Sequence, residues 1–406
     1  MSGRTVLAVP GMIGELKAFR EFGTETLCSE THCAALDLTV PTFTNEFWTA
    51  RQRAAHSLHE ISYRACFKPQ LPRFFIERLT VPGEIVYDPF MGRGTTPVEA
   101  ALLGRVPYGC DVNPLSAMLT APRLSEPDCA AIEQRLAELD LNYDGDIPED
   151  LLVFYHPDTL RELCALRRHF SAKKLSAADQ WIRMVAVNRL TGHSAGFFSV
   201  YTLPPNQAVT VESQRKINEK RHQIPEYRDV KKLILRKSRA LWKDCTEQIP
   251  FYLGQPLLLA ENCAETPEIT SDSVSLIVTS PPFLDVVDYK QDNWLRNWLV
   301  SIDPDSLEIT LERTSAAWQT AMTRVFRELY RVLRPGGHMA FEVGEIRHGS
   351  LHMEDLVLPA GCEAGFTPEL ILINAQEFTK TAHCWGVDNH AKGTNTNRIV
   401  LFRKDS

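Results

Sequence analysis

The chain has 406 residues, of which 44% are hydrophobic and 23% charged, and its net charge is −7. This length suits one large α/β domain with an insert, or two domains, and the composition is that of an ordinary soluble globular protein. The charge excludes a polycationic chain, although a local basic surface could still contact nucleic acid. We find neither a convincing signal peptide nor the ~20 apolar residues of a membrane span, so we expect a cytoplasmic protein.

Ten cysteines are scattered along the chain without a CxxC pair, which is typical of reduced thiols in a cytosolic protein. Cys28, His32 and Cys33 lie close together in the sequence and form one half of a zinc-site pattern. Because no second ligand pair completes the pattern, we expect no metal site.

Residues 1–60 show no clear periodicity, and the pattern sharpens after them. Residues 71–80 predict a helix, and residues 82–90 predict a turn followed by a strand. A second helix is expected over 95–105 after a glycine-rich loop, and a short strand over 106–114 ends in an acid. This order is the beginning of a βαβ unit.

The region from about 126 to 250 is mostly helical in pattern, and the alternation of strands and loops resumes after it. The later predicted elements are strands at 256–265, 273–283 and 338–344, an amphipathic helix at 317–333, and a terminal strand pair at 367–378 and 397–404. Together these elements predict an open α/β sheet interrupted by a helical insert of about 125 residues.

A glycine-rich loop follows the first predicted strand in the sequence DPFMGRGTT, Asp88 to Thr96. Gly92 and Gly94 let the backbone pass close to a ligand, and the amides at the start of the next helix can hold a carboxylate. Asp111, at the next strand end, stands where an acid usually binds a ribose diol. The pair predicts an adenosine-containing cofactor, with a tight turn and a solvated acid as the alternatives. The lack of GxGxxG argues against NAD, and the lack of GKS or GKT argues against a P-loop ATPase.

A second motif ends a buried strand in the sequence TSPPF, Thr279 to Phe283. Pro281 and Pro282 have no backbone N–H, so this strand end offers carbonyl acceptors and an aromatic face with almost no donors. Such an environment favours a flat group that carries an NH2. A plain Pro-Pro loop after a strand is the alternative.

The two motifs together resemble those of the DNA amino-methyltransferases, the family that makes N4-methylcytosine and N6-methyladenine. That family has a DPFxGxGTT cofactor motif and a [SDN]PP[YFW] catalytic motif, and the serine form looks like the N4-cytosine branch. The flanking sequences at 67–90, 271–283 and 329–344 are similar as well. The resemblance covers about residues 61–122 and 255–403.

The resemblance implies an α/β fold, the Rossmann-like class I methyltransferase fold that depends on S-adenosylmethionine, with a mixed, mostly parallel seven-stranded sheet and a helical insert. The chain then divides into an N-terminal extension (1–60), a cofactor-binding half (61–125), a helical insert that is a candidate DNA recognition region (126–250) and a catalytic half (251–406). The implied cofactor-binding residues are Phe67, Asp88, Pro89, Phe90, Gly92, Gly94, Thr95, Thr96 and Asp111. In many relatives an acid before the catalytic strand contacts the cofactor's adenine; Asn262 and Cys263 stand there, so that contact stays open.

The implied reaction is site-specific methylation of a flipped-out cytosine in double-stranded DNA. The implied catalytic residues are Ser280, Pro281, Pro282 and Phe283. Ser280 and the Pro281 carbonyl would accept hydrogen bonds from the N4 hydrogens, and Phe283 would stack on the base. A restriction endonuclease that acts on the same site is a candidate partner.

Other functions stay open. The cofactor motif precedes the catalytic motif, whereas many N4-cytosine relatives have the reverse order, so N6-adenine methylation is the nearest alternative. RNA or protein-amide methylation and a catalytically silent binding module are the others.

A basic stretch, residues 213–243, lies in the predicted insert and contains eleven Lys or Arg against three Asp or Glu. Such a concentration suits phosphate contact, and a solvated helix face is the alternative. The predicted DNA-binding residues are Arg215, Lys216, Lys231, Lys232, Arg236 and Lys237.

Overall fold

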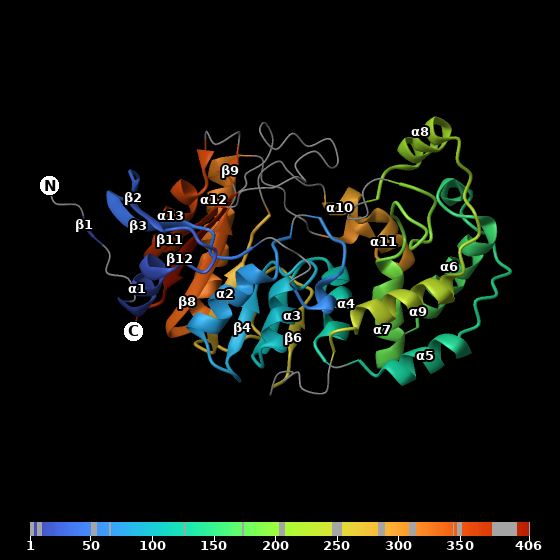
Figure 1. The fold of residues 1–406 in the computed structure, drawn as a ribbon, viewed down its shortest axis with the longest axis horizontal. Coiled ribbons are helices and arrows are strands. Elements are labelled where there is room, and N and C mark those ends of the chain that lie inside the picture. Colours follow the sequence, from blue (N-terminus) through green and yellow to red (C-terminus); the bar gives the residue numbers. More distant parts are fainter. Residues whose placement is uncertain are drawn as a thin grey trace.

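The protein has an α/β part, which contains both chain ends, and a helical part at the other end of its long axis (Figure 1). The computed structural model describes residues 4–5, 10–49, 55–64, 66–125, 127–172, 174–202, 208–245, 254–282, 289–307, 314–343, 345–346, 351–375 and 396–405. Among these residues, no helix is both long enough and apolar enough to cross a membrane.

In the described part of the chain, ten strands form one mixed sheet in the order β1-β3-β11-β12-β8-β7-β4-β5-β6, with β2 paired to β3. The run β6-β5-β4-β7-β8 is parallel and has the 3-2-1-4-5 order of a doubly wound fold. β12 lies antiparallel between β8 and β11. The strands are β1 Arg4–Thr5, β2 Leu27–Cys33, β3 Leu38–Asn45, β4 Ile85–Asp88, β5 Val106–Cys110, β6 Leu257–Leu259, β7 Val274–Thr279, β8 Leu333–Val343, β11 Thr367–Ala375 and β12 Thr396–Arg403, with a separate pair β9 Glu345–Ile346 and β10 Leu351–His352.

The predicted fold class is confirmed. Seven neighbouring strands, in the order β6-β5-β4-β7-β8-β12-β11, form the mixed, mostly parallel sheet of a Rossmann-like methyltransferase. The first sixty residues add β1, β2 and β3, where the sequence predicts no element, and β3 runs parallel to β11. β2 is exposed along most of its length, and β3 contains Pro41. Neither strand therefore shows the clean two-residue alternation by which a strand is recognised.

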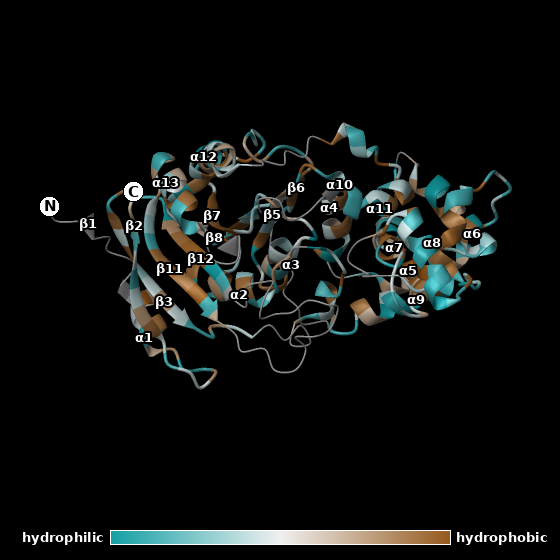
Figure 2. Ribbon diagram, turned by 90° about the horizontal axis from the view of Figure 1, so that it is seen from above, coloured by the Kyte–Doolittle hydropathy of each residue, from teal (hydrophilic) through white to brown (hydrophobic). Residues whose placement is uncertain are grey.

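Helices cover both faces of the sheet. α2 packs on the face that carries Leu276 and Val278, whereas α12 and α13 pack on the opposite face, which carries Ile277 and Phe341. The central strands therefore carry apolar residues on both faces, and Figure 2 shows brown, hydrophobic stretches in the strands of this sheet. The helices are α1 Pro10–Ala18, α2 Gln70–Leu79, α3 Thr95–Leu102, α4 Pro114–Thr120, α5 Cys129–Glu138, α6 Pro157–Phe170, α7 Ala177–Val187, α8 Val211–Arg221, α9 Val230–Leu241, α10 Tyr289–Asp292, α11 Trp294–Leu299, α12 Ser315–Val332 and α13 Glu354–Glu363, with the 3-10 turns η2 Ser57–His59, η3 Ala121–Arg123, η4 Glu149–Val153 and η5 Pro304–Ser306.

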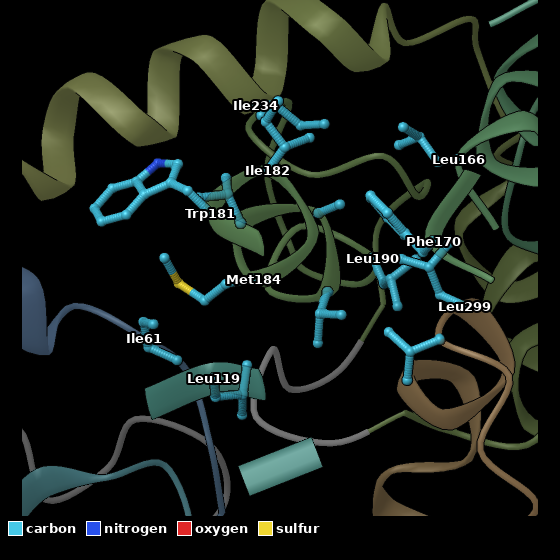
Figure 3. Packing of buried hydrophobic residues seen from close by; sticks show 14 of the residues in the cluster. Ile61, Leu119, Leu166, Phe170, Trp181, Ile182, Met184, Leu190, Ile234 and Leu299 are labelled. Atoms are coloured by element: carbon cyan, nitrogen blue, oxygen red, sulfur yellow. The ribbon is translucent and has the colours of Figure 1, made fainter. Parts of the chain in front are cut away.

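Helices α5 to α9 come between β5 and β6 and form the helical part. Its core includes Phe170, Trp181 and Ile234, and the same cluster takes in Leu119 of α4 and Leu299 of α11 (Figure 3). α4 follows the second strand of the cofactor half, and α11 follows the Ser-Pro-Pro motif. The helical part is therefore packed against both halves of the predicted site. The division of the chain into four parts remains a proposal.

Candidate active site

The glycine-rich loop connects β4, which ends at Asp88, to α3, which begins at Thr95. Gly94 has a φ of +78° and Gly92 a φ of +49°, conformations that residues with a Cβ rarely adopt. A Cβ on Gly94 would also lie 2.2 Å from Oγ1 of Thr120 in α4. Only glycine therefore permits this turn. The first backbone amides of α3 have no acceptor within the helix, so they are available to bind another group.

Asp111 follows β5, which runs parallel to β4 with Gly109 opposite Asp88. Its carboxylate accepts hydrogen bonds from the amide of Gly92 at 3.0 Å and from the amide of Asn113 at 2.9 Å. Burial raises the pKa of Asp111, and these hydrogen bonds act against that rise. A carboxylate offers about four acceptor positions, so further donors such as ribose hydroxyls can bind beside the loop.

Arg93, in the middle of the loop, is not among the residues predicted from the sequence. Its buried guanidinium donates hydrogen bonds to the carbonyls of Ile61 at 2.7 Å and Phe67 at 3.3 Å. The ring of Tyr63 lies 3.6 Å from the position that a Cβ on Gly92 would take. Arg93 thus ties the segment before α2 to the loop, and a lone arginine among small loop residues is the sequence signal for it. Of the other predicted cofactor residues, Phe67 lies in this segment, Pro89 and Phe90 lie in the loop, and Thr95 and Thr96 begin α3.

The second motif follows β7, which is buried along its whole length. Ser280 is half-exposed, Pro281 is buried and Pro282 is half-buried. The carbonyl of Pro282 accepts a hydrogen bond from the indole Nε1 of Trp318 in α12 at 3.1 Å. This bond anchors the motif to the helix that covers the sheet. Phe283, the fourth predicted catalytic residue, lies outside the described residues.

Hydrogen bonds join the two motifs directly, because β4 and β7 are neighbouring parallel strands. Oγ1 of Thr279 donates to Oδ1 of Asp88 at 2.6 Å, and Oγ1 of Thr96 donates to the carbonyl of Val278 at 3.1 Å. Burial raises the pKa of Asp88 to about 7, although the hydrogen bond from Thr279 lowers it. The motifs meet at the carboxyl ends of adjacent strands, where open α/β sheets bind ligands.

Glu342, on β8, is a buried acid that the sequence analysis does not single out. β8 pairs with β7 so that Phe341 is opposite Thr279, which brings Glu342 beside Ser280. The side-chain amide of Asn397 donates a hydrogen bond to the Glu342 carboxylate. Burial raises the pKa of Glu342 to about 7, and the Asn397 amide and the neighbouring Ser280 hydroxyl act against that rise. A single acid inside the apolar strand HMAFEV is the sequence signal that identifies it.

Asn262 and Cys263, the pair left open by the sequence, follow β6. Cys263 is buried in the core, and burial raises the pKa of its thiol. Asn262 is exposed, and its Oδ1 accepts a hydrogen bond from the amide of Ala264 at 3.0 Å. Neither side chain supplies a carboxylate at this place. Within the described ranges, no three His, Cys, Asp or Glu side chains gather in a way that could hold a metal ion.

The predicted DNA-binding residues on α8 lie on a helix that projects from the helical part (Figure 1). Arg215 and Lys216 are exposed, and Arg215 forms an ion pair with Asp150 at 3.1 Å. α8 buries only Gln214, whose amide donates to the carbonyl of Tyr201 at 3.0 Å. Most of its surface is therefore available to a polar partner.

The predicted DNA-binding residues on α9 divide differently. Lys232 and Arg236 are exposed, and Lys231 and Arg236 donate hydrogen bonds to backbone carbonyls of neighbouring segments. Lys237 is only 11% exposed and pairs with Glu60 at 3.3 Å, and burial lowers its pKa. α9 is amphipathic, and lysine or arginine side chains beside its buried face fold back onto the protein. Lys237 is thus placed toward the interior, not in the surface position that phosphate contact requires.

A family model and two relatives each match a minor part of the chain. A family model described as DNA methylase matches residues 39–118. The chain is 32% identical over 89 residues to the Type II methyltransferase M.MjaII of Methanocaldococcus jannaschii, which covers 22% of this chain and 16% of the relative. It is 32% identical over 111 residues to the Type II methyltransferase M.MvaI of Kocuria varians, which covers 27% of this chain and 23% of the relative. The matches thus span less than a quarter of the length of either relative.

Among solved structures, a SAM-dependent methyltransferase of Methanosarcina mazei is 10% identical and has a TM-score of 0.33, over 82% of this chain and 97% of that chain. The family match includes the glycine-rich loop and Asp111. Over residues 39–118, the chain is similar to the DNA methylase family.

Proposed function

We propose that this chain is a methyltransferase that transfers a methyl group from S-adenosylmethionine to the exocyclic N4 amine of cytosine at a specific site in double-stranded DNA. The observation that carries the proposal is the hydrogen bond of 2.6 Å between Thr279 and Asp88. It joins a loop suited to an adenosine-type cofactor to a strand end suited to an amine. Direct transfer between two bound groups needs mainly such positioning.

S-adenosylmethionine fits the residues of the loop. Gly94 has a positive φ and packs against Thr120 where a Cβ would lie, so this turn requires glycine. Asp111 would accept the ribose hydroxyls, and the first amides of α3 would hold the carboxylate. Pro89, Phe90, Thr95 and Thr96 shape the same loop, and Phe67 borders it. The cofactor supplies a methyl group on positively charged sulfur, so the amine needs no covalent enzyme intermediate.

The Ser-Pro-Pro motif would orient the amine. The N4 lone pair of cytosine is delocalised into the ring, which makes the amine a poor nucleophile. Ser280 and the carbonyl of Pro281 would accept hydrogen bonds from its hydrogens and draw the lone pair out of conjugation. The carbonyl of Pro282 is occupied by Trp318, which supports Pro281 as the acceptor. We assign base stacking to Phe283.

Double-stranded DNA is the proposed partner. The target base must leave the duplex, because its amine lies inside the stack. The exposed cations Arg215 and Lys216 of α8 and Lys232 of α9 support phosphate contact by the helical part. The matched relatives are named Type II methyltransferases, and we propose a restriction endonuclease with the same site as a partner, in the cytoplasm.

N6-methylation of adenine is the second candidate. The observation that favours it is the chain order, in which the cofactor strand β4 precedes the catalytic strand β7 with α5 to α9 between them. Many N4-cytosine relatives have the reverse order. Adenine carries the same kind of delocalised amine, so the acceptors at Ser280 and Pro281 would act in the same way.

Nucleoside mass spectrometry distinguishes these candidates. The purified protein is incubated with unmodified, mixed-sequence duplex DNA and methyl-deuterated S-adenosylmethionine, and the DNA is digested. We expect labelled N4-methyldeoxycytidine. Labelled N6-methyldeoxyadenosine would establish the second candidate with the same fold and cofactor. Label that enters only RNA or protein offered in parallel would overturn DNA as the substrate.

A Ser280→Ala variant is the control for the assigned chemistry. Because Ser280 would touch the base and not the cofactor, its loss should lower turnover much more than cofactor affinity. Calorimetry with S-adenosylmethionine measures the affinity. Equal losses of turnover and affinity would contradict the role of Ser280.

A further inference from the structure

We propose that two buried arginines, Arg93 in the glycine-rich loop and Arg123 behind it, hold the carboxylate of the cofactor through their positive charge. The proposal rests on the proposed methyl transfer and names the groups that orient its cofactor. Both arginines are positioning residues, because oxygen atoms of the protein already accept hydrogen bonds from their guanidinium groups and their charge acts through the loop.

Arg123 supports the loop from behind. It ends the 3-10 turn η3, three positions after Thr120, and its side chain is fully buried. Its guanidinium donates hydrogen bonds to the carbonyls of Leu119 at 2.9 Å and Leu58 at 3.0 Å, and also to the carbonyl of Arg93. Thr120 fills the Cβ position of the glycine that follows Arg93. One stretch of chain therefore gives the loop both a packing contact and a fixed cation.

Arg93 is 4% exposed and is held in the same way. Its guanidinium donates to Oγ1 of Thr95 at 3.1 Å and to the carbonyls of Ile61 at 2.7 Å and Phe67 at 3.3 Å. In the described part of the chain, the acceptors of both guanidinium groups are neutral oxygens, so no carboxylate forms an ion pair with either of them.

The acids around the loop are engaged by other groups. Glu99 of α3 forms hydrogen bonds with His59 and Arg73, both at 2.6 Å. The carboxylate of Asp111 accepts backbone amides, and that of Asp88 accepts a threonine hydroxyl. The two arginines therefore bring buried positive charge to the loop, and none of these acids pairs with it.

An anion at the loop would compensate this charge. Burying a cation without an acid is costly. Burial and the charge of Arg93 lower the pKa of Arg123 to about 9, so Arg123 stays charged at neutral pH. The free amides at the start of α3 would place the carboxylate of the cofactor beside the same loop. Its binding would offset the repulsion between the two arginines.

The charges also favour one orientation of the cofactor. S-adenosylmethionine carries a sulfonium and an ammonium, which the arginines repel, and one carboxylate, which they attract. Asp111 lies at the amide of Gly92, whereas Arg123 lies at the carbonyl of Arg93. The loop thus has an acid for the ribose hydroxyls at one residue and a cation for the carboxylate at the next.

Calorimetric binding of two ligands tests the role of charge. S-adenosylhomocysteine has the carboxylate, whereas its decarboxylated analogue keeps the ammonium but lacks the carboxylate. We expect Arg123→Gln to lower the affinity for S-adenosylhomocysteine by roughly tenfold and to leave the affinity for the analogue unchanged.

Arg105→Gln is the matched control. Arg105 is also buried and donates to neutral oxygens, but it lies beyond the opposite end of α3. This variant should bind both ligands as the unaltered protein does. Equal losses of affinity for the two ligands in Arg123→Gln would reveal a structural role alone and overturn the proposal. A selective loss in Arg105→Gln as well would also overturn it.

Arg123→Lys keeps the charge and covers the case in which the glutamine variant does not fold. Burial lowers the pKa of a lysine, so this side chain should lose its proton more readily than an exposed lysine does. The affinity for S-adenosylhomocysteine should then fall as the pH rises through that pKa, whereas the ratio of the two affinities in the unaltered protein should stay constant near neutral pH. A folded lysine variant with a constant ratio would contradict the proposal.

These measurements need no DNA, so they separate the proposal from the proposed function. A selective loss of affinity for the carboxylate ligand, in a protein that methylates no DNA base, would support the role of Arg123 and overturn DNA methylation alone.

Discussion

The hydroxyl of Thr279 donates a hydrogen bond of 2.6 Å to the carboxylate of Asp88, although the two residues are 191 positions apart in the chain. Asp88 begins the glycine-rich loop, and Thr279 precedes Ser280. The bond therefore makes the cofactor loop and the catalytic strand end one unit. A substitution in either motif should therefore alter the geometry of the other.

Thr279→Val should weaken both the fold and cofactor binding. It leaves the buried Asp88 without its side-chain donor, which costs about 1–3 kcal/mol in the free energy of unfolding. Urea unfolding and calorimetric titration with S-adenosylmethionine measure the two effects. Thr279→Ser keeps the hydroxyl and is the matched control. If the valine and serine variants behave alike, the hydrogen bond has no such role.

Gly94→Ala should cost more stability than Gly83→Ala. Both glycines have positive φ, at +78° and +87°, but only Gly94 has a side chain, that of Thr120, in the space of a Cβ. The backbone alone costs about 1–2 kcal/mol, so the excess at Gly94 measures the close approach of α4. Cofactor affinity should fall only for Gly94→Ala. Equal effects of the two substitutions in urea unfolding would contradict this account of the loop.

Asp88 and Glu342 should each destabilise the folded protein as the pH rises from about 4 to about 7, whereas His56 and His59, whose pKa values burial lowers, act in the opposite sense. The folded state raises the pKa of Asp88 from 3.8 and of Glu342 from 4.5, both to about 7, so it binds these two protons more tightly than the unfolded chain does. The penalty is absent below the unfolded pKa values, grows through neutrality and is constant above it, on the order of a few kcal/mol for each acid. Asp179 and Glu328, whose pKa values are lowered to about 2, act in the opposite sense only in more acidic solution.

Urea unfolding at acidic and at mildly alkaline pH checks this dependence. Asp88→Asn should reduce the difference between the two conditions, because the amide does not titrate. A difference that stays the same in Asp88→Asn would assign the effect to other groups.

Charge reversal on α8 should weaken DNA binding. The double variant Arg215→Glu, Lys216→Glu removes two candidate phosphate contacts, so the slope of log affinity against log salt should become shallower by about two. Fluorescence anisotropy with duplex DNA at several salt concentrations measures the slope. Lys17→Glu, an exposed lysine of α1 at the other end of the molecule, is the control (Figure 1). An equal effect of the control would place the DNA surface elsewhere.

Prediction from the sequence succeeds where the signal is local. The sequence predicts the turn at Gly94 because glycines follow the strand that ends at Asp88. The structure shows the positive φ that such a turn requires. Prediction of the DNA-binding residues is weaker for α9. The basic stretch 213–243 shows that Lys237 is a cation, but not that its side chain lies beside the buried face of the helix. The sequence does not predict a role for Glu342, because its hydrogen-bond partner Asn397 is 55 positions away in the chain.

By itself, the sequence determines the α/β class and the two motifs, because periodicity, glycine conformation and the missing N–H of proline act over a few residues. Only the tertiary structure decides that β3 joins the sheet beside β11, that Asp88 meets Thr279, and that Glu342 on β8 lies beside the end of β7. Each depends on which strands become neighbours. That order is set by the packing of the whole sheet against its helices, and no local pattern encodes it.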